Sequence, residues 1–338
     1  MSLLPLYLLS IPYRWVVQAR VLFYKVGIFG TKRLPCPVIS VGNITVGGTG
    51  KTPLVMLLAR GLRERGITIA ILSRGYKRKQ SSDSLVSDGE SLFLSPDEAG
   101  DEPYLMASVL KGVPVLVGQE RFTTGRVALQ RFGVSGLLLD DGYQHLQLHR
   151  DLNILLIDSN VGFGEDHLLP RGILREPLSH LQRADLFVLT KVGEPKACLS
   201  LERKLHEIHP RAEVFHSHYE PIGLISPKGE SEDLQTLRGK KVLALSGIAN
   251  PDYFSFLLRR CGMEIGKESI FPDHHFYTKR DLTCIEESSK GMDRIVTTEK
   301  DMLKLQRLGI GHLPMRALRI EMKIWQEKEF FKRIISLF

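Results

Sequence analysis

The sequence has little cysteine and no long uninterrupted apolar run, and these two shortages exclude several classes of protein. Its 338 residues include only four cysteines, which lie far apart and form no CxxC pair. We therefore expect neither a disulfide framework nor a zinc site, and a reducing cytosol fits this cysteine usage best. Hydrophobic residues make up 43% of the chain and charged residues 25%, which is typical of a folded globular protein.

Acidic residues are fewer than basic residues in this sequence. Lysine and arginine together number 46 against 38 aspartates and glutamates, which gives a formal net charge of +8. This excess predicts an anionic partner, such as a nucleotide phosphate, a phosphorylated substrate, nucleic acid or an anionic membrane surface. Because the chain has no nucleic-acid recognition motif and no basic tract with interleaved aromatic residues, we do not expect nucleic acid as a partner.

The first thirty residues are unusually apolar. No lysine or arginine precedes the apolar run and no A-x-A cleavage pattern follows it, so the segment is not expected to be an export signal. Prolines and basic residues break it well short of the ~20 apolar residues of a membrane span. From about Pro12, a helical projection places apolar residues such as Trp15 and Leu22 on one face. We predict an amphipathic helix within residues 1–33, which either packs on its own domain or, as Trp15 beside basic residues favours, lies at a membrane surface.

Short apolar runs alternate with helix-length stretches from residue 34 to about residue 215. The expected strands are Val38 to Val41, Ile67 to Leu72, Val113 to Val117, Leu137 to Asp140, Ile154 to Asp158 and Leu186 to Leu189. This alternation predicts an α/β fold with a doubly wound, mostly parallel sheet over residues 34–215, and the glycine-rich loop described below makes this fold P-loop NTPase-like.

A second cluster of elements follows. Expected strands at Lys241 to Leu245 and Arg294 to Thr297 flank an expected helix at Pro251 to Cys261. We predict a smaller carboxyl-terminal α/β domain with connector strands over residues 216–325, and a final helix over residues 326–338.

A glycine-rich loop, GNITVGGTGKT over residues 42–52, lies between the first expected strand and the following helix. Backbone N–H groups of such a loop approach phosphate oxygens, and the helix N-terminus adds positive charge. The residues expected to bind ATP are Thr45, Val46, Gly47, Gly48, Thr49, Gly50, Lys51 and Thr52. Lys51 would reach the β- and γ-phosphates, and the Thr52 hydroxyl would ligate Mg²⁺. Thr45 stands where the consensus has glycine, but the GKT core remains.

A pair of acids ends the apolar run Leu137 to Leu139. Asp140 would hold Mg²⁺ directly or through water, and Asp141 would either ligate the metal or orient a nucleophile. The alternative without metal chemistry is an Asp-Gly turn that ends a strand.

P-loops occur in kinases, GTPase switches, ATPases and passive nucleotide binders. The sequence at Thr190 and Lys191 is close to the guanine-reading pattern N/T-K-x-D, but Gly193 replaces its carboxylate, which disfavours a GTPase. Two functions therefore remain to be compared. One is a kinase that uses ATP and Mg²⁺, and the other is a membrane-bound nucleotide-binding regulatory protein without kinase activity. A reactive base and an acceptor site would distinguish the two.

Several phrases in this sequence resemble the tetraacyldisaccharide 4′-kinase family of lipid A synthesis. They are VGNITVGGTGKTP from Val41, SRGY from Ser73, GDEP from Gly100, LDDGYQH from Leu139, RGILREP from Arg171, SGIANPDYF from Ser246, FPDHHFY from Phe271 and TTEKD from Thr297. The resemblance implies an ATP- and Mg²⁺-dependent phosphotransferase at the cytoplasmic face of the bacterial inner membrane. Its acceptor would be the 4′-hydroxyl of the acylated disaccharide 1-phosphate, on the route to lipopolysaccharide.

The resemblance also implies which residues act on the acceptor. The expected substrate-binding residues are Tyr76, Glu102, Arg121, His145, Arg171 and Arg175. Asp101 and His274 join Lys51 as catalytic residues, with Asp101 as general base and His274 assisting it, because a carboxylate held against Mg²⁺ is a poor proton acceptor. Each of these also has a structural alternative: acids that cap a helix, a surface arginine, or a histidine bonded to backbone.

Overall fold

The computed structural model describes residues 4–76, 78 and 83–338, and the chain divides into two compact units. One unit runs to His218 and resumes at Met322, and the other is Tyr219–Glu321. The chain passes from one unit to the other within β8 (Glu213–Ile225) and returns within β13 (Met315–Ile324). The predicted bounds of independently folding domains, 34–215 and 216–325, stay predictions.

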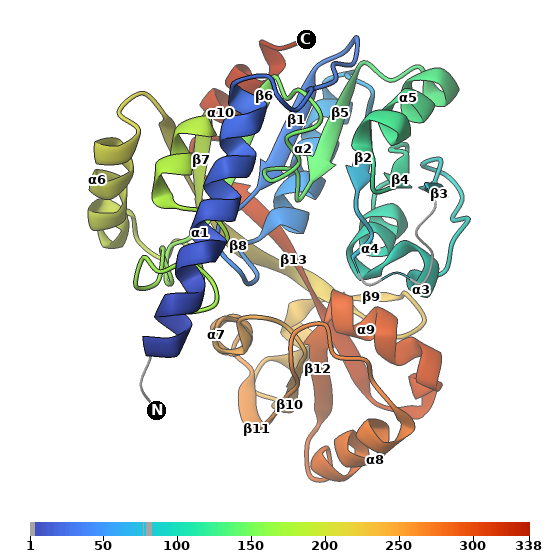
Figure 1. The fold of residues 1–338 in the computed structure, drawn as a ribbon. Helices are drawn as coiled ribbons and strands as arrows, with labels where there is room; N and C mark the ends of the chain where they lie inside the picture. Colours follow the sequence, from blue (N-terminus) through green and yellow to red (C-terminus); the bar gives the residue numbers. More distant parts are fainter. Residues whose placement is uncertain (1–3, 77, 79–82) are drawn as a thin grey trace. The chain divides into compact units, whose positions relative to one another are not determined.

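The first unit is built on a mostly parallel sheet (Figure 1). Its strands are β1 (Val38–Gly42), β2 (Ile69–Ser73), β3 (Ser84–Ser87), β4 (Val115–Val117), β5 (Gly136–Asp140), β6 (Leu152–Asp158) and β7 (Leu186–Thr190). They lie in the order β7-β6-β1-β5-β2-β4-β3, and the start of β8 pairs with β7. All these pairs are parallel except β3 with β4. The predicted α/β class with a doubly wound, mostly parallel sheet is confirmed.

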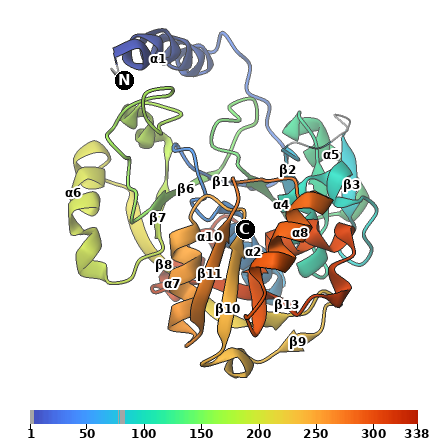
Figure 2. The ribbon, with the colours of Figure 1, turned by 90° about the horizontal axis from the view of Figure 1, so that it is seen from below.

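Helices cover both faces of this sheet, and Figure 2 shows α1 and α2 on opposite sides of it. The helices of this unit are α1 (Leu4–Lys25), α2 (Lys51–Glu64), α3 (Pro96–Ala99), α4 (Asp101–Val109), α5 (Arg121–Phe132), α6 (Leu199–Ile208) and α10 (Glu327–Ile335), with 3₁₀ turns η1 (Leu178–Arg183) and η2 (Pro195–Cys198). Every residue of β1, β2, β5, β6 and β7 is buried, which explains their nearly continuous apolar runs.

The second unit is a smaller parallel α/β structure. Its strands lie in the order β11 (Glu264–Ile270), β10 (Lys241–Ser246), β12 (Arg294–Thr298) and β13, all parallel. Its helices are α7 (Pro251–Arg260), α8 (Lys279–Ser288) and α9 (Glu299–Leu305), with 3₁₀ turns η3 (Leu234–Leu237), η4 (Gln306–Leu308) and η5 (Ile310–His312). The short β9 (Ser231–Glu232) pairs antiparallel with the end of β8.

The amino-terminal helix lies within the predicted residues 1–33. It runs from Leu4 to Lys25 and continues through Pro12, so it extends beyond the stretch in which the apolar face was recognised. Pro5 lies in the first turn, where a backbone N–H has no helical partner, and Pro12 removes only one hydrogen bond. Trp15 is 70% exposed and Val16 68%, so this apolar face does not pack on the rest of the unit. No helix in the described part of the chain is long and apolar enough to cross a membrane.

Candidate active site

The glycine-rich loop follows the carboxyl end of β1 and leads directly into α2. Gly50, with φ 92°, precedes the first residue of α2, Lys51. Asn43 ties the two ends of the loop together, because its Nδ2 donates to Thr49 Oγ1 at 2.9 Å and its Oδ1 accepts from Lys51 Nζ at 3.3 Å. The ammonium of Lys51 is thus held beside the loop.

The acidic pair lies next to this loop because β5 is the immediate neighbour of β1, with Val41 paired to Asp140. Asp140 is buried; its Oδ2 accepts from Ser73 Oγ at 2.9 Å, and its Oδ1 has no hydrogen-bond partner among the described residues. Asp141 lies between two cations: its Oδ1 is 3.4 Å from Lys51 Nζ and its Oδ2 is 3.3 Å from an Arg175 guanidinium nitrogen.

The two neighbouring carboxyls have opposite pKa shifts. Burial, together with the charges of Glu102 and Asp141, raises the pKa of Asp140 to about 7. Burial also acts to raise the pKa of Asp141, but Lys51 and Arg175 outweigh it and hold this pKa below its ordinary value. Asp141 is therefore ionised at neutral pH, whereas a cation beside Asp140 would be needed to keep it fully ionised.

Two further predicted residues, Arg121 and His145, lie near this site: Asp140 and Asp141 affect the pKa of Arg121, and Arg121 affects the pKa of His145. Arg121 begins α5 and is only 3% exposed, so it is not a surface residue, and it donates to the carbonyls of Gly118 and Gln119 at 3.1 and 3.2 Å. Burial lowers its pKa to about 10, and Asp140 opposes this shift. Burial and the charge of Arg121 lower the pKa of His145 to about 4, so this imidazole is neutral at pH 7.

Asp101 and Glu102 occupy the first two positions of α4. Gly100 is the N-cap and no side chain caps this helix, so neither acid has the N-cap role. Gly75, with φ 67°, allows the turn that carries Tyr76 to approach, because a Cβ there would lie 2.8 Å from the Ala99 carbonyl oxygen. Tyr76 itself is 60% exposed. The loop after β2 thus packs against the start of α4.

The proline-bounded segment 170–177 runs along the outer part of the glycine-rich loop. Val46 N donates to the Ile173 carbonyl at 2.8 Å, and Arg175 N donates to the Ile44 carbonyl at 2.7 Å. This pairing brings the Arg175 side chain to Asp141.

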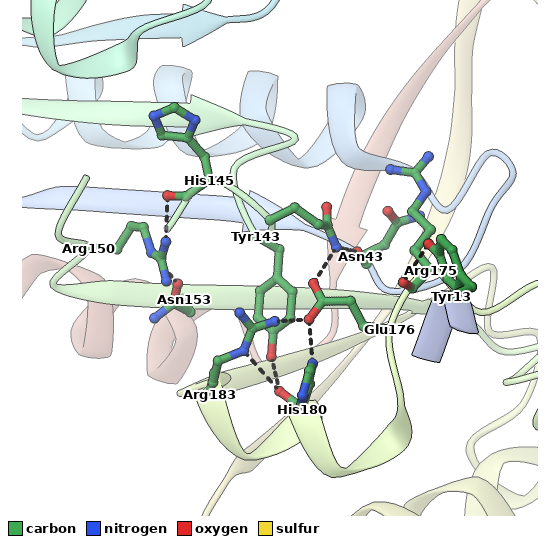
Figure 3. A network of polar contacts seen from close by, with 11 residues as sticks. Tyr13, Asn43, Tyr143, His145, Arg150, Asn153, Arg175, Glu176, His180 and Arg183 are labelled. Carbon is green, nitrogen blue, oxygen red and sulfur yellow. Dashed lines mark hydrogen bonds and ion pairs between the residues drawn. The ribbon is translucent and has the colours of Figure 1, made fainter. Parts of the chain in front are cut away.

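The same segment contacts α1. The Arg171 guanidinium lies over the Tyr7 ring at 5.1 Å. Figure 3 shows the second contact, in which Tyr13 Oη donates to the Arg175 carbonyl at 2.9 Å. Arg171 is therefore held at the amino-terminal helix, whereas Arg175 reaches the acidic pair.

Behind the loop lies a buried polar network that sequence reasoning missed (Figure 3). Glu176 accepts from Gln144 Nε2 at 3.0 Å and contacts His180 Nδ1 at 2.7 Å and Arg183 at 2.5 Å. Burial acts to raise the pKa of Glu176, but His180 and Arg183 outweigh it and lower this pKa. Gln144 Nε2 also donates to the Asn43 carbonyl at 2.8 Å, which joins the network to the glycine-rich loop. The only sequence signal for Gln144 was its place inside LDDGYQH.

Lys191 is a second residue whose role the sequence did not indicate. Its buried ammonium pairs with Asp158 and donates to the Gly48 carbonyl at 2.9 Å. The neighbouring Thr190 Oγ1 donates to the Thr49 carbonyl at 3.0 Å. Two carbonyls of the glycine-rich loop thus accept hydrogen bonds from residues at the end of β7. The residues that matched part of a guanine-reading pattern instead contact the glycine-rich loop.

His274 belongs to the second unit, in the turn after β11. It has φ 59°, its Nε2 is 3.2 Å from Lys300 Nζ, and the same ammonium is 3.5 Å from Asp273 Oδ1. His275 stacks on Phe271 with ring centroids 4.7 Å apart. No group of three His, Cys, Asp or Glu side chains in the described residues could hold a metal ion.

Comparisons with known proteins cover nearly the whole chain. The LpxK family model, described as tetraacyldisaccharide-1-P 4′-kinase, matches residues 2–338. A tetraacyldisaccharide 4′-kinase of Syntrophus aciditrophicus is 43% identical over 96% of this chain and 93% of its own, and one of Geobacter sulfurreducens is 42% identical over 93% and 88%. A crystal structure of the "apo" form of LpxK from Aquifex aeolicus in complex with ATP is similar with a TM-score of 0.78 and 36% identity, over 100% of this chain and 98% of that one.

Proposed function

We propose a function for this chain from one premise: it belongs to the tetraacyldisaccharide-1-P 4′-kinase family. The proposed reaction is transfer of the γ-phosphate of ATP to the 4′-hydroxyl of tetraacyldisaccharide 1-phosphate. One observation carries this proposal: Lys51 lies between the glycine-rich loop and Asp141, beside the buried Asp140. Triphosphate binding and metal-dependent phosphoryl transfer need such an arrangement at one edge of a parallel sheet.

The chain's own groups would neutralise the phosphates of ATP. Val46 N and Thr49 N donate to the Ile173 and Gly47 carbonyls, so the remaining backbone N–H groups of the glycine-rich loop and the positive end of α2 would bind the phosphate oxygens, with Lys51 at the β- and γ-phosphates. Phosphoryl transfer depends chiefly on positioning and charge stabilisation, so fixed cations contribute most. The buried Arg121 and the ion-paired Arg175 supply further positive charge around Asp141.

The residues present fit a magnesium ion. Asp140 offers a buried carboxylate oxygen without a hydrogen-bond partner in the described part of the chain, and Thr52 is buried in the first turn of α2. Mg²⁺ prefers oxygen ligands and commonly uses one or two carboxylates with substrate phosphates. We therefore assign Thr52, Asp140 and Asp141 to hold it. When bound, the ion would neutralise charge on the transferring phosphoryl group.

The acceptor hydroxyl must lose a proton as it attacks. We assign the role of general base, which accepts this proton, to Asp101, and His274 assists it. Asp140 and Asp141 are better suited to hold the metal ion. Acceptor binding is assigned to the remaining predicted residues, which are Tyr76, Glu102, Arg121, His145, Arg171 and Arg175.

The exposed apolar face of α1 supports a place at the cytoplasmic face of the anionic inner membrane, where the lipid acceptor lies. Replacing Trp15, Leu22 and Phe23 with serine should move the protein out of the lipid fraction in liposome flotation. It should also raise the KM for lipid while leaving ATP affinity unchanged. A variant that still floats but melts much earlier would show that this face packs within the protein.

The reaction itself is tested by ATP consumption with and without tetraacyldisaccharide 1-phosphate. The proposal predicts that consumption depends on the lipid and that phosphorylated lipid and ADP accumulate in step. A nucleotide-binding regulatory protein would bind ATP but show no lipid-dependent turnover, and that result would reject the proposed function.

A further inference from the structure

The turn after β11 holds its two adjacent histidines in different surroundings. The imidazole of His275 stacks on Phe271 and packs edge-on against Tyr277 with ring centroids 5.0 Å apart, and its Nε2 is 3.2 Å from Asp281 Oδ2. His275 is thereby built into the packing of the second unit. His274 instead lies in the left-handed backbone region, which is uncommon for residues other than glycine, and its ring contacts a lysine.

The lysine contact determines which nitrogen of His274 carries the proton. An ammonium has three donors and no acceptor, so the 3.2 Å contact from Lys300 Nζ is a hydrogen bond only if His274 Nε2 accepts. A neutral imidazole with Nε2 as acceptor carries its proton on Nδ1. Asp273, whose Oδ1 is 3.5 Å from the same ammonium, is 4.0 Å from His274 Nε2 and is too far to take a proton from it.

The position of Lys300 is itself well fixed. It is the second residue of α9, whose N-cap Thr298 accepts from Asp301 N at 3.1 Å. The fully buried Asp301 also accepts from Gly247 N at 2.9 Å, which ties the start of α9 to the end of β10. The Lys300 side chain is 16% exposed, so its ammonium is held among these groups.

We propose that Lys300 is a positioning residue: its ammonium donates to His274 Nε2 and so places the ring proton on Nδ1, which makes His274 a hydrogen-bond donor through Nδ1 and not a base. This inference rests on the proposed function where it concerns phosphoryl transfer. In that reaction the Nδ1–H of His274 stabilises a carboxylate base or orients the acceptor hydroxyl, and the proton of the hydroxyl goes to the carboxylate.

The tautomer is tested directly by two-bond ¹⁵N–¹H correlation spectra of the full chain with labelled histidine, with His274→Gln used to assign the signals. Wild type should show a protonated Nδ1 and an unprotonated Nε2 at His274. Lys300→Met should shift His274 to the Nε2–H tautomer or to a mixture, while Lys300→Arg, which keeps the donor, should retain the wild-type pattern. A wild-type spectrum with the proton on Nε2, or no change in Lys300→Met, overturns the proposal.

Kinetics separate positioning from folding. Lys300→Met should lower kcat about tenfold, as expected for one lost hydrogen bond to a reacting group, with the KM for ATP and the Tm little changed. Lys300→Arg should recover most of the rate, and the matched control Lys279→Met, which removes an exposed lysine at the start of α8, should behave as wild type. Equal losses in Lys300→Met and Lys300→Arg would overturn the positioning role. A wild-type protein without kinase activity would instead reject the proposed function, and the spectra would still decide the tautomer.

Discussion

The glycine-rich loop after β1 and the histidine turn after β11 both carry proposed chemistry, but they are built in different ways. The loop is held through its backbone: Gln144 bonds the carbonyl of Asn43, and Lys191 and Thr190 bond the carbonyls of Gly48 and Thr49. The histidine turn is organised through side chains, with one ring packed among aromatic residues and the other hydrogen-bonded to Lys300.

This difference predicts two kinds of variant. Changes around the loop should alter nucleotide binding, because the loop's shape presents the N–H groups that we propose bind phosphate. Changes at the turn should alter the rate at constant nucleotide affinity, because the proposed proton transfer contributes to the transition state and not to nucleotide binding.

The largest effect is expected for Lys51→Ala. Removing the cation beside the transferring phosphate should lower kcat by about 10³-fold, the scale on which a preorganised charge-stabilising group acts. Lys51 is ion-paired at the site and is not part of the apolar core, so the Tm should stay close to that of wild type. Kinase rate and thermal melting measured together check this. A folded variant with near wild-type activity would remove the nucleotide-site assignment.

Asp101→Ala tests the acceptor side. Loss of a general base should lower kcat by roughly 10²-fold or more while Mg²⁺-ATP binding persists. His274→Ala should cost less, and the double variant should fall short of the summed losses because both residues act on one proton. Nucleotide Kd measured beside kcat decides the outcome. If Asp101→Ala loses nucleotide affinity in proportion to rate, Asp101 is a metal ligand.

Lys191→Met tests the backbone support of the loop. Leaving Asp158 buried without its partner should cost about 3–5 kcal/mol of stability. Asp158→Asn added to this variant should recover part of the Tm but not the affinity for ATP, because the Gly48 carbonyl loses its bond to Lys191. The matched control is Lys204→Met, whose exposed pair with Asp166 should contribute about 0–1 kcal/mol. Equal effects of the two lysine variants would show that Lys191 does not support the loop.

The smallest effect separates the two neighbouring acids in the nucleotide-free protein. The pKa of Asp140 is raised from 3.8 to about 7, so its contribution to stability is present below pH 4 and is lost as pH rises from about 4 to 7. The pKa of Asp141 is lowered, so its contribution is present above its unfolded pKa and is lost as pH falls. Asp140→Asn should therefore raise the Tm at pH 8 by about 2–4 °C and Asp141→Asn should lower it. Melting curves at pH 5 and pH 8 check both signs, and a loss of stability at pH 8 in Asp140→Asn would contradict the cause given for its pKa.

Much of the fold could be predicted because its signals are local. The apolar runs at β1, β5 and β6 are read directly, since parallel strands covered on both faces must be apolar along their whole length. The first turns of α1 could not be recognised from the sequence because proline usually interrupts a helix, whereas this helix tolerates Pro12 at the loss of one hydrogen bond.

The candidate site could be predicted only where a single segment of the sequence contains all the residues of a motif. The glycine-rich loop is such a segment, and its neighbour Asp140 follows from strand order. Lys191 and Lys300 could not be found in this way. Their partners, Gly48 and His274, lie 143 and 26 residues away in the chain, and only folding brings each pair together.

The most direct measurement is the identity of the product formed from tetraacyldisaccharide 1-phosphate and Mg²⁺-ATP. Mass spectrometry and ³¹P NMR of the purified lipid should show one added phosphate, on the 4′-oxygen, with wild type and its loss with Lys51→Ala. Unmodified lipid from a folded wild-type protein that binds ATP, or a phosphate on any other oxygen, would contradict the proposed reaction.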